Sequence, residues 1–172
     1  VYTPVTNRSL LDIAEKMKVD YLLDVVRKNL DLTFYLVHSN GEIVTESSNR
    51  QDKYNQSNLS GYYQAYNYMA LRDKDTRYSG MISYIQNTVT VNQLNYMLPR
   101  FLEDPTLLQD LPVATAIPTS YHKHFKYSDM VRIRKDDVDI SILTNNSTFL
   151  TYFKGEAALE AIRLSSAFFG KG

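Results

Sequence analysis

The sequence has no cysteine, no tryptophan, no net charge and no long apolar run. Without cysteine, disulfides, thiolate nucleophiles and cysteine-based zinc sites are excluded, although many exported bacterial proteins also lack cysteine. Lys and Arg together number 19, as do Asp and Glu. The chain therefore lacks the charge excess of nonspecific nucleic-acid binding and the polybasic run of a membrane-surface protein. No apolar stretch approaches the ~20 residues of a bilayer span, so we expect neither nucleic acid nor a membrane span.

The two ends of the sequence suggest a piece of a larger protein. The chain starts at Val1 without methionine and shows no signal peptide. It stops at Phe168-Phe169-Gly170, an apolar pair followed by a turn signal. We expect that the natural start is missing and that a further strand follows.

The first part of the chain predicts two helices. Ser9 is a candidate N-cap for a helix over 10–17, and Asp20 for a longer one over 21–37. Gly41 would end the second helix, because glycine tolerates the left-handed conformation of a C-terminal cap. The face expected to be buried carries Leu22, Val25, Leu32 and Leu36.

Helical periodicity resumes at about Gly61. A helix is predicted over 91–98, with Pro99 disturbing its end, and a short one from Pro105 to Leu111. Pro112 and Pro118 would bound a linker. The predicted buried stripes are Tyr62, Tyr66, Met69 and Ala70, then Tyr78, Met81, Ile82 and Ile85.

After Tyr127 the period changes from about 3.6 to about 2 residues, which indicates strands. Val131 to Arg134 and Val138 to Ile142 form a hairpin candidate, and Phe149 to Lys154 a third strand. Residues 159–169 are ambiguous, with a slight local preference for helix. We therefore expect an α+β fold, with a helical segment over residues 1–118 and a β-rich segment over 119–172.

Several residues have weak functional signals. His38 at a helix end is best explained by the helix dipole. His122 and His124 lack further ligands at convincing spacing, so no metal site is predicted, and no phosphate-binding loop or nucleophile elbow that would indicate a cofactor or serine hydrolase is present. The sequence has 14 tyrosines, and packing is favoured over sugar stacking at any one of them.

The loop from Glu46 to Ser60 is the most informative segment. It is polar, lacks periodicity and is longer than most connections. Arg50 suits a carboxylate, because its guanidinium offers two donors in one plane. Gln51 and Asp52 can hydrogen-bond hydroxyl groups, and Tyr54 can stack on a sugar ring or transfer a proton. The alternative is a solvated loop whose charges pair locally.

The order of these features resembles the heparinase II/III-like polysaccharide lyases. The resemblance starts with a helix pair, Asn40-Gly41, a short hydrophobic piece, Glu46, the polar loop and a tyrosine-rich helix. It continues in a later passage that is similar to the entry into the family's β-sandwich, namely Ser128 to Arg134, Phe149-Leu150, Gly155, Ile162-Arg163-Leu164 and Phe168-Phe169-Gly170. The resemblance implies an incomplete (α/α) toroid followed by the first strands of a β-sandwich, with residues 159–169 extended.

The resemblance also implies β-elimination of a uronic-acid polysaccharide outside the cytoplasm, in the periplasm or beyond the cell, without a cofactor. Arg50 and Tyr54 would be catalytic, and the substrate-binding residues would be Glu46, Gln51, Asp52, Tyr62 and Tyr63. A homodimer would cover the open helix faces. Because Arg50-Gln51-Asp52 stands where these lyases often have a Tyr-His pair, two alternatives stay open. One is a non-catalytic carbohydrate-binding or scaffold protein, and the other a helical interaction module.

Overall fold

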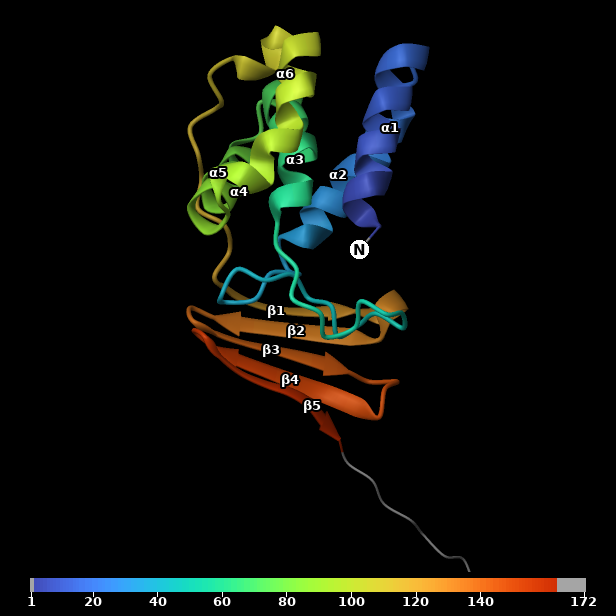
Figure 1. Ribbon diagram of the computed structural model, residues 1–172. Helices are drawn as coiled ribbons and strands as arrows, with labels where there is room; N and C mark the ends of the chain where they lie inside the picture. The colour runs from blue at the N-terminus through green and yellow to red at the C-terminus, as the bar shows by residue number, and fades with distance from the viewer. Residues whose placement is uncertain (1, 164–172) are drawn as a thin grey trace, which may run out of the picture. The chain divides into compact units, whose positions relative to one another are not determined.

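The computed structural model describes residues 2–163, and these residues form an α+β fold (Figure 1). Contacts between backbone positions divide the chain into two compact units. The helical unit comprises Val1–Val37, Gly41–Ile43 and Ser57–Pro118. The sheet unit comprises His38–Asn40, Val44–Gln56 and Thr119–Gly172.

The helical unit contains six α-helices within the described residues, separated by short 3-10 turns. Lys18 and Lys74 adopt the left-handed conformation just after the first and third helices. The Asp75 side chain accepts from the backbone N–H of Arg77 and so caps the fourth. Among residues 2–163 no helix combines the length and apolarity that crossing a bilayer requires. The helices are α1 Thr3–Met17, α2 Tyr21–Thr33, α3 Tyr63–Asp73, α4 Thr76–Thr88, α5 Val91–Leu94 and α6 Leu98–Glu103, and the 3-10 turns are η1 Ser60–Tyr62, η2 Asn95–Met97 and η3 Pro105–Leu108.

The predicted end of the first helix at Met17 and the predicted start of the second at Tyr21 are confirmed. The predicted start of the first helix and end of the second were wrong. Helix α1 begins well before Ser9, with a proline in its first turn. Helix α2 ends at Thr33, whose hydroxyl donates to the carbonyl of Asn29. Gly41 does have a left-handed φ of 88°, but it lies in the turn between Val37 and Ile43, which form an isolated antiparallel bridge.

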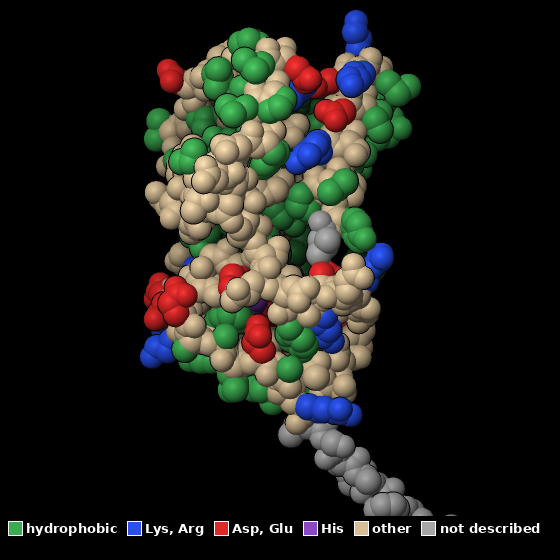
Figure 2. All heavy atoms as spheres, viewed as in Figure 1, with side chains coloured by type: hydrophobic (Ala, Val, Ile, Leu, Met, Phe, Trp, Pro, Cys, Tyr) green, Lys and Arg blue, Asp and Glu red, His purple; other side chains and the backbone are tan. Residues whose placement is uncertain are grey.

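The face predicted to be buried on α2 was also wrong. Helix α2 carries two apolar stripes, and the buried one contains Leu23, Val26 and Leu30. Val25 and Leu32 are 42% and 37% exposed. Figure 2 shows hydrophobic side chains at the surface of the helical unit. Periodicity alone finds both stripes and cannot tell which one is covered.

Pro99 does not disturb the end of a helix over 91–98. Helix α5 stops at Leu94, and after a 3-10 turn Pro99 occupies the second position of α6. Proline fits there because the first-turn N–H has no helical acceptor. Pro105 opens a 3-10 turn that ends at Leu108, short of the predicted Leu111.

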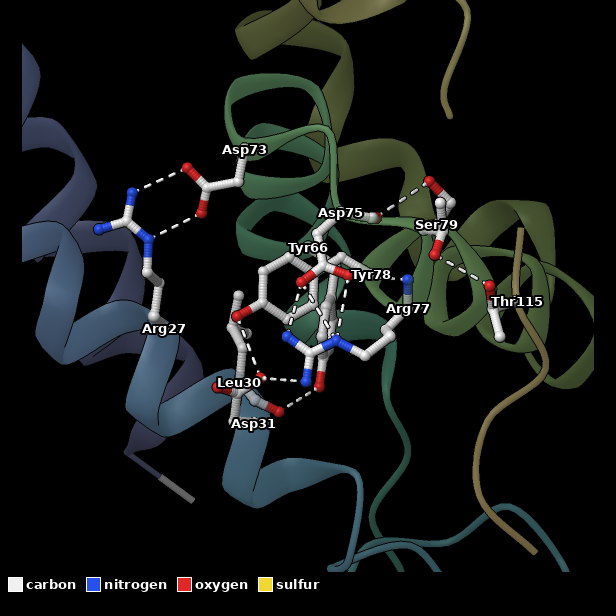
Figure 3. Close-up of polar contacts among 11 residues, drawn as sticks. Arg27, Leu30, Asp31, Tyr66, Asp73, Asp75, Arg77, Tyr78, Ser79 and Thr115 are labelled. Atoms are coloured by element: carbon white, nitrogen blue, oxygen red, sulfur yellow. Dashed lines mark hydrogen bonds and ion pairs between the residues drawn. The ribbon is translucent and has the colours of Figure 1, made fainter. Parts of the chain in front are cut away.

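The core of the helical unit combines aliphatic side chains with a group of aromatic rings, and the stripes predicted on α3 and α4 are confirmed as buried. The rings of Phe34 and Tyr78 stack with centroids 6.1 Å apart, and Tyr66 meets Tyr78 edge-on at 5.6 Å. Both hydroxyls donate to α2, that of Tyr66 to the carbonyl of Leu30 and that of Tyr78 to Asp31 (Figure 3). Tyrosine thus satisfies its polar atom inside an apolar core.

An ion pair connects α2 to the end of α3. Nε and Nη2 of Arg27 donate to the two carboxylate oxygens of Asp73 at 2.7 and 2.8 Å (Figure 3). This two-bond geometry gives orientation as well as attraction.

The segment from Pro112 to Pro118 passes directly over Gly80 of α4. The N–H of Thr115 donates to the carbonyl of Thr76 at 3.0 Å. A Cβ atom at position 80 would lie 1.7 Å from the carbonyl oxygen of Thr115. Only glycine therefore allows this close approach of two backbones.

The sheet unit holds a five-stranded antiparallel sheet in the order β1-β2-β3-β4-β5. The hairpin of β2 and β3 and the third predicted strand are confirmed. Residues 157–163 are extended, as the resemblance implied and against their helical propensity, because β5 pairs with β4. Residues 164–169 of that expectation lie outside the described part of the chain. The strands are β1 Ser120–Phe125, β2 Met130–Lys135, β3 Val138–Leu143, β4 Thr148–Lys154 and β5 Ala157–Arg163.

The more deeply buried face of the sheet is polar. Arg132 of β2 faces Ser141 of β3, and Arg134 faces Asp139. All four side chains are buried. The β-branched residues between them, such as Ile133 and Ile140, are only partly buried. The alternation identifies the strands, but the charged face is the covered one.

We predict that Gly80→Ala destabilises the chain. Alanine favours a helix over glycine by about 1 kcal/mol, but here its Cβ collides with a backbone carbonyl that cannot rotate away. We expect the free energy of unfolding to fall by about 1–3 kcal/mol, measured by urea denaturation with circular dichroism. Ser83→Ala, an exposed position of the same helix, is the control and should be neutral. An unchanged or higher stability for Gly80→Ala would contradict the close approach.

Candidate functional site

A network of charged side chains lies buried in the sheet unit. His38, Glu46, Arg132 and Asp139 are 1%, 2%, 0% and 0% exposed. His38 Nδ1 lies 2.7 Å from Asp139 Oδ1, and His38 Nε2 lies 3.3 Å from Glu46 Oε2. The segment that includes His38 is thereby attached to β3, and through His38 to the start of the polar loop.

Asp139 is the centre of this network. Its Oδ1 also accepts from Arg132 Nη1 at 2.9 Å, and its Oδ2 accepts from the backbone N–H of Ser39 at 2.6 Å. Arg132 Nη1 donates in addition to Ser141 Oγ at 2.6 Å. Both carboxylate oxygens of Asp139 therefore have donors, as a buried carboxylate requires.

The contacts of His38 are those of a doubly protonated imidazolium between two ionised carboxylates. An ionised carboxylate only accepts hydrogen bonds, and neutral histidine has a single N–H donor. Each ring nitrogen of His38 faces a carboxylate oxygen, so both nitrogens carry a proton when both carboxylates are ionised. The ring also stacks on Phe153 of β4, with centroids 3.9 Å apart.

The electrostatics agree with this assignment. Burial lowers the pKa of His38, but its hydrogen bonds to Asp139 and Glu46 outweigh burial and raise the pKa above the ordinary value. Burial raises the pKa of Asp139, yet the hydrogen bond to His38 and the charge of Arg132 bring the pKa to about 2. Burial raises the pKa of Glu46, but the hydrogen bond to His38, the charge of His38 and the hydrogen bond to Ser141 together lower it below the ordinary value. The network thus consists of charged groups that compensate one another.

The polar loop after Glu46 is held by short-range hydrogen bonds. Ser48 Oγ donates to Asp52 Oδ1 at 2.7 Å and accepts from the N–H of Arg50 at 3.2 Å. The amide of Asn55 donates to the carbonyl of Gln51 at 3.0 Å. The hydrogen bond from Ser48 lowers the pKa of Asp52. The predicted loop is confirmed, and its polar groups shape a series of turns.

The predicted site residues occupy different environments. Glu46 is buried in the network, whereas Arg50 and Gln51 are exposed. Asp52 and Tyr54 are half-buried. Tyr54 has a left-handed φ of 60°, and its hydroxyl is buried without a hydrogen-bond partner among the described residues. The loop therefore presents Arg50 and Gln51 to solvent and holds its other polar residues close to the protein.

Tyr62 and Tyr63 belong to the core of the helical unit. Burial raises the pKa of both, and the hydroxyl of Tyr63 accepts from Gln86 Nε2 at 3.2 Å. Both rings pack against other core residues, and Tyr63 also lines a pocket together with Leu94, Met97 and Phe101. The assignment of the two tyrosines to substrate binding stays a prediction.

Sequence reasoning missed most of the buried network. His38 does not lie at a helix end, because α2 stops at Thr33, so the predicted helix-dipole role was wrong. Arg132 and Asp139 lie within the predicted hairpin, where the alternation of apolar and polar residues gives the polar ones no particular role. The available signal was their register, since paired strands carry Arg opposite Ser and Arg opposite Asp on one face.

The other histidines do not form a metal site in the described structure. His122 and His124 lie on β1 and are exposed. Residues 2–163 contain no group of three or more His, Asp or Glu side chains arranged to hold a metal ion.

Comparison with known proteins gave no match, whether to a protein-family model, to a curated protein or to a solved structure. The function is therefore argued from the geometry.

We predict that the free energy of unfolding declines above neutral pH because His38 loses a proton. Because the folded pKa of His38 is raised, its contribution is complete below the unfolded value of about 6.5 and is lost as the pH rises through the folded pKa. Asp139 acts oppositely, with a contribution present above about pH 3.9 and lost as the pH falls toward its folded pKa of about 2. Urea midpoints measured between pH 4 and pH 9 should fall on the alkaline side. His38→Gln should remove that decline, and His122→Gln, at an exposed position, should retain it.

We also predict that Asp139→Asn severely destabilises the sheet unit. It leaves His38 and Arg132 buried with reduced compensation, and removing one partner of a buried ion pair costs about 3–5 kcal/mol. Thermal unfolding by calorimetry is the measurement. Asp137→Asn, in the exposed turn before β3, should unfold like the wild type. Equal melting temperatures for all three proteins would show that the network contributes nothing.

Proposed function

We propose that this chain is part of a polysaccharide-lyase-like protein that cleaves a uronic-acid-containing polysaccharide by β-elimination. The observation that carries the proposal is an exposed Arg50 on a loop whose base is fixed by Glu46 and whose turn is fixed by the bond between Ser48 and Asp52. Because hydrogen bonds already fix this loop, less conformational entropy is lost when it binds an extended ligand.

In the proposed reaction Arg50 binds the uronate carboxylate through its planar donors. Neutralising this group favours loss of the proton on the adjacent carbon, because carbanion-like charge spreads onto the carboxylate in the transition state. Tyr54 is the loop residue proposed for proton transfer. This role requires its hydroxyl, which is buried in the structure, to become accessible when the substrate binds. A double bond forms as the glycosidic oxygen leaves with its electron pair and takes up a proton. Gln51 and Asp52 supply hydrogen bonds to sugar hydroxyls.

The architecture is compatible with this class. In the intact protein that we propose, the helical unit is part of an (α/α) toroid and the antiparallel sheet is the start of a β-sandwich. Because acidic polysaccharides of this kind lie outside the cytoplasm, the proposed location is the periplasm or the extracellular space.

The alternative is a non-catalytic carbohydrate-binding or scaffold protein of the same architecture. The observation that favours it is the burial of both His38 and Glu46. Their polar atoms contact each other and Asp139, so neither is presented to a substrate. Such a protein would bind the polymer through Arg50 and Gln51 without cleaving it.

The exposed apolar residues of α1 and α2 favour a further role in association. Val5, Met17 and Tyr21 are largely exposed, and association would remove their apolar surface from water. A homodimer that covers these helix faces is the form we propose. It is compatible with either carbohydrate function.

The test uses the intact protein that contains this chain. It is incubated with a panel of uronic-acid polysaccharides, and the ultraviolet absorbance of the unsaturated product is followed. We expect product from one substrate class, and a loss of at least about 100-fold in Arg50→Ala and Tyr54→Phe, the range that general acid–base groups supply. Arg72→Ala, at an exposed position of α3, should keep full activity.

The same samples distinguish the alternative. Polysaccharide that is retained by the immobilised protein, released from Arg50→Ala and never cleaved would support the binding protein. Neither cleavage nor retention from folded protein would reject both carbohydrate functions.

A further inference from the structure

A small apolar pocket lies at the surface of the helical unit. Its walls come from the start of α3, from α5 and the 3-10 turn that follows it, and from α6. Its volume is about 190 Å³, which exceeds the roughly 150 Å³ of an apolar cavity that holds one benzene molecule. Three of its lining residues, Val91, Asn95 and Leu98, are exposed, so the pocket can be reached from solvent. The others are Tyr63, Leu94, Met97 and Phe101.

The pocket and the sequence around it are uncharged. Among the described residues no charged side chain lines the pocket, and the sequence from Tyr78 to Pro99 contains no Asp, Glu, Lys, Arg or His. Arg100, the next charged residue, donates to Glu15 of α1 at 2.5 Å. A charged ligand would lose its hydration in this pocket without gaining a counter-ion. The pocket therefore favours an uncharged ligand.

Side-chain amides lie at the pocket and beside it. Asn95 lines the pocket, and Asn92 is exposed on α5 between two lining residues. The exposed Gln86 donates to the hydroxyl of Tyr63 at 3.2 Å. An amide offers both donors and an acceptor, and the interior of the pocket is otherwise apolar. This surface favours a ligand that has an apolar part for the pocket and hydrogen-bonding groups for the surrounding amides.

We propose that this pocket binds an uncharged N-acetylated sugar unit through its acetamido group. The acetamido methyl is apolar and packs against the pocket lining, to which Tyr63 and Phe101 contribute aromatic surface. The acetamido C=O and N–H match the donor and the acceptor of the Asn95 side chain. The sugar hydroxyls stay at the surface, where water and neighbouring amides solvate them. This site shares no residue with the loop that carries Arg50 and does not depend on the elimination chemistry.

The binding test is a ligand-observed nuclear magnetic resonance experiment on the full chain. The probe is di-N-acetylchitobiose, and the comparator is cellobiose, which has a hydroxyl in place of each acetamido group. We expect saturation transfer from the protein to be strongest at the acetamido methyl. Cellobiose should bind at least about tenfold more weakly, because a hydrophobic pocket loses such a factor when a matched apolar group is missing. Equal binding of the two sugars, or binding of phenol without binding of di-N-acetylchitobiose, would overturn the proposal.

Variants at exposed positions keep the test independent of folding. Asn95→Ala should weaken binding of di-N-acetylchitobiose about fivefold, because a hydrogen bond to the ligand is lost, whereas Asn92→Ala should not. Leu98→Asp places a charge in the lining and should abolish binding, whereas Leu102→Asp, on the same helix and outside the lining, should retain it. All four positions are exposed, so the melting temperatures should stay close to that of the wild type. Wild-type binding by Asn95→Ala or by Leu98→Asp would show that the sugar binds elsewhere and would reject the site.

Discussion

The contact between His38 and Asp139 is the interaction on which the sheet unit depends. It joins residues 101 positions apart and holds the segment before the polar loop to β3. A buried charge is costly without a partner, and the imidazolium of His38 has two, because it donates to Glu46 as well. Arg132 supplies a second positive charge beside Asp139.

The helical unit is held together in a different way. Its apolar core includes aromatic rings, and the hydroxyls of Tyr66 and Tyr78 donate to α2, so these tyrosines serve packing. Its ion pairs, such as that of Arg27 with Asp73, lie nearer the surface and orient helices that the apolar core already attracts. The proposed carbohydrate chemistry therefore rests on the loop of the sheet unit and not on the tyrosine-rich helix.

The sequence predicted the elements better than their environments. The stripes of α3 and α4, the polar loop and the hairpin of β2 and β3 follow from local periodicity, which short-range geometry controls. Distant segments decide which stripe of α2 is buried. They also decide that the charged face of the sheet is the covered one. No local pattern in the sequence reveals these segments. The candidate site shows the same limit. Arg50 could be recognised by its chemistry, whereas His38 acquires its role only through residues about a hundred positions later.

The long sequence separation of His38 and Asp139 affects the order in which the chain can fold during synthesis. A ribosome adds about 5–20 residues per second, so His38 leaves it roughly 5–20 seconds before Asp139 exists. During that interval the histidine and Glu46 have each other but no strand to lie against. The helices can assemble as they emerge, whereas the polar loop can reach its final conformation only after the sheet has been synthesised. A chaperone that binds newly made chains would therefore encounter a folded helical region together with a polar loop that has not yet packed against the sheet.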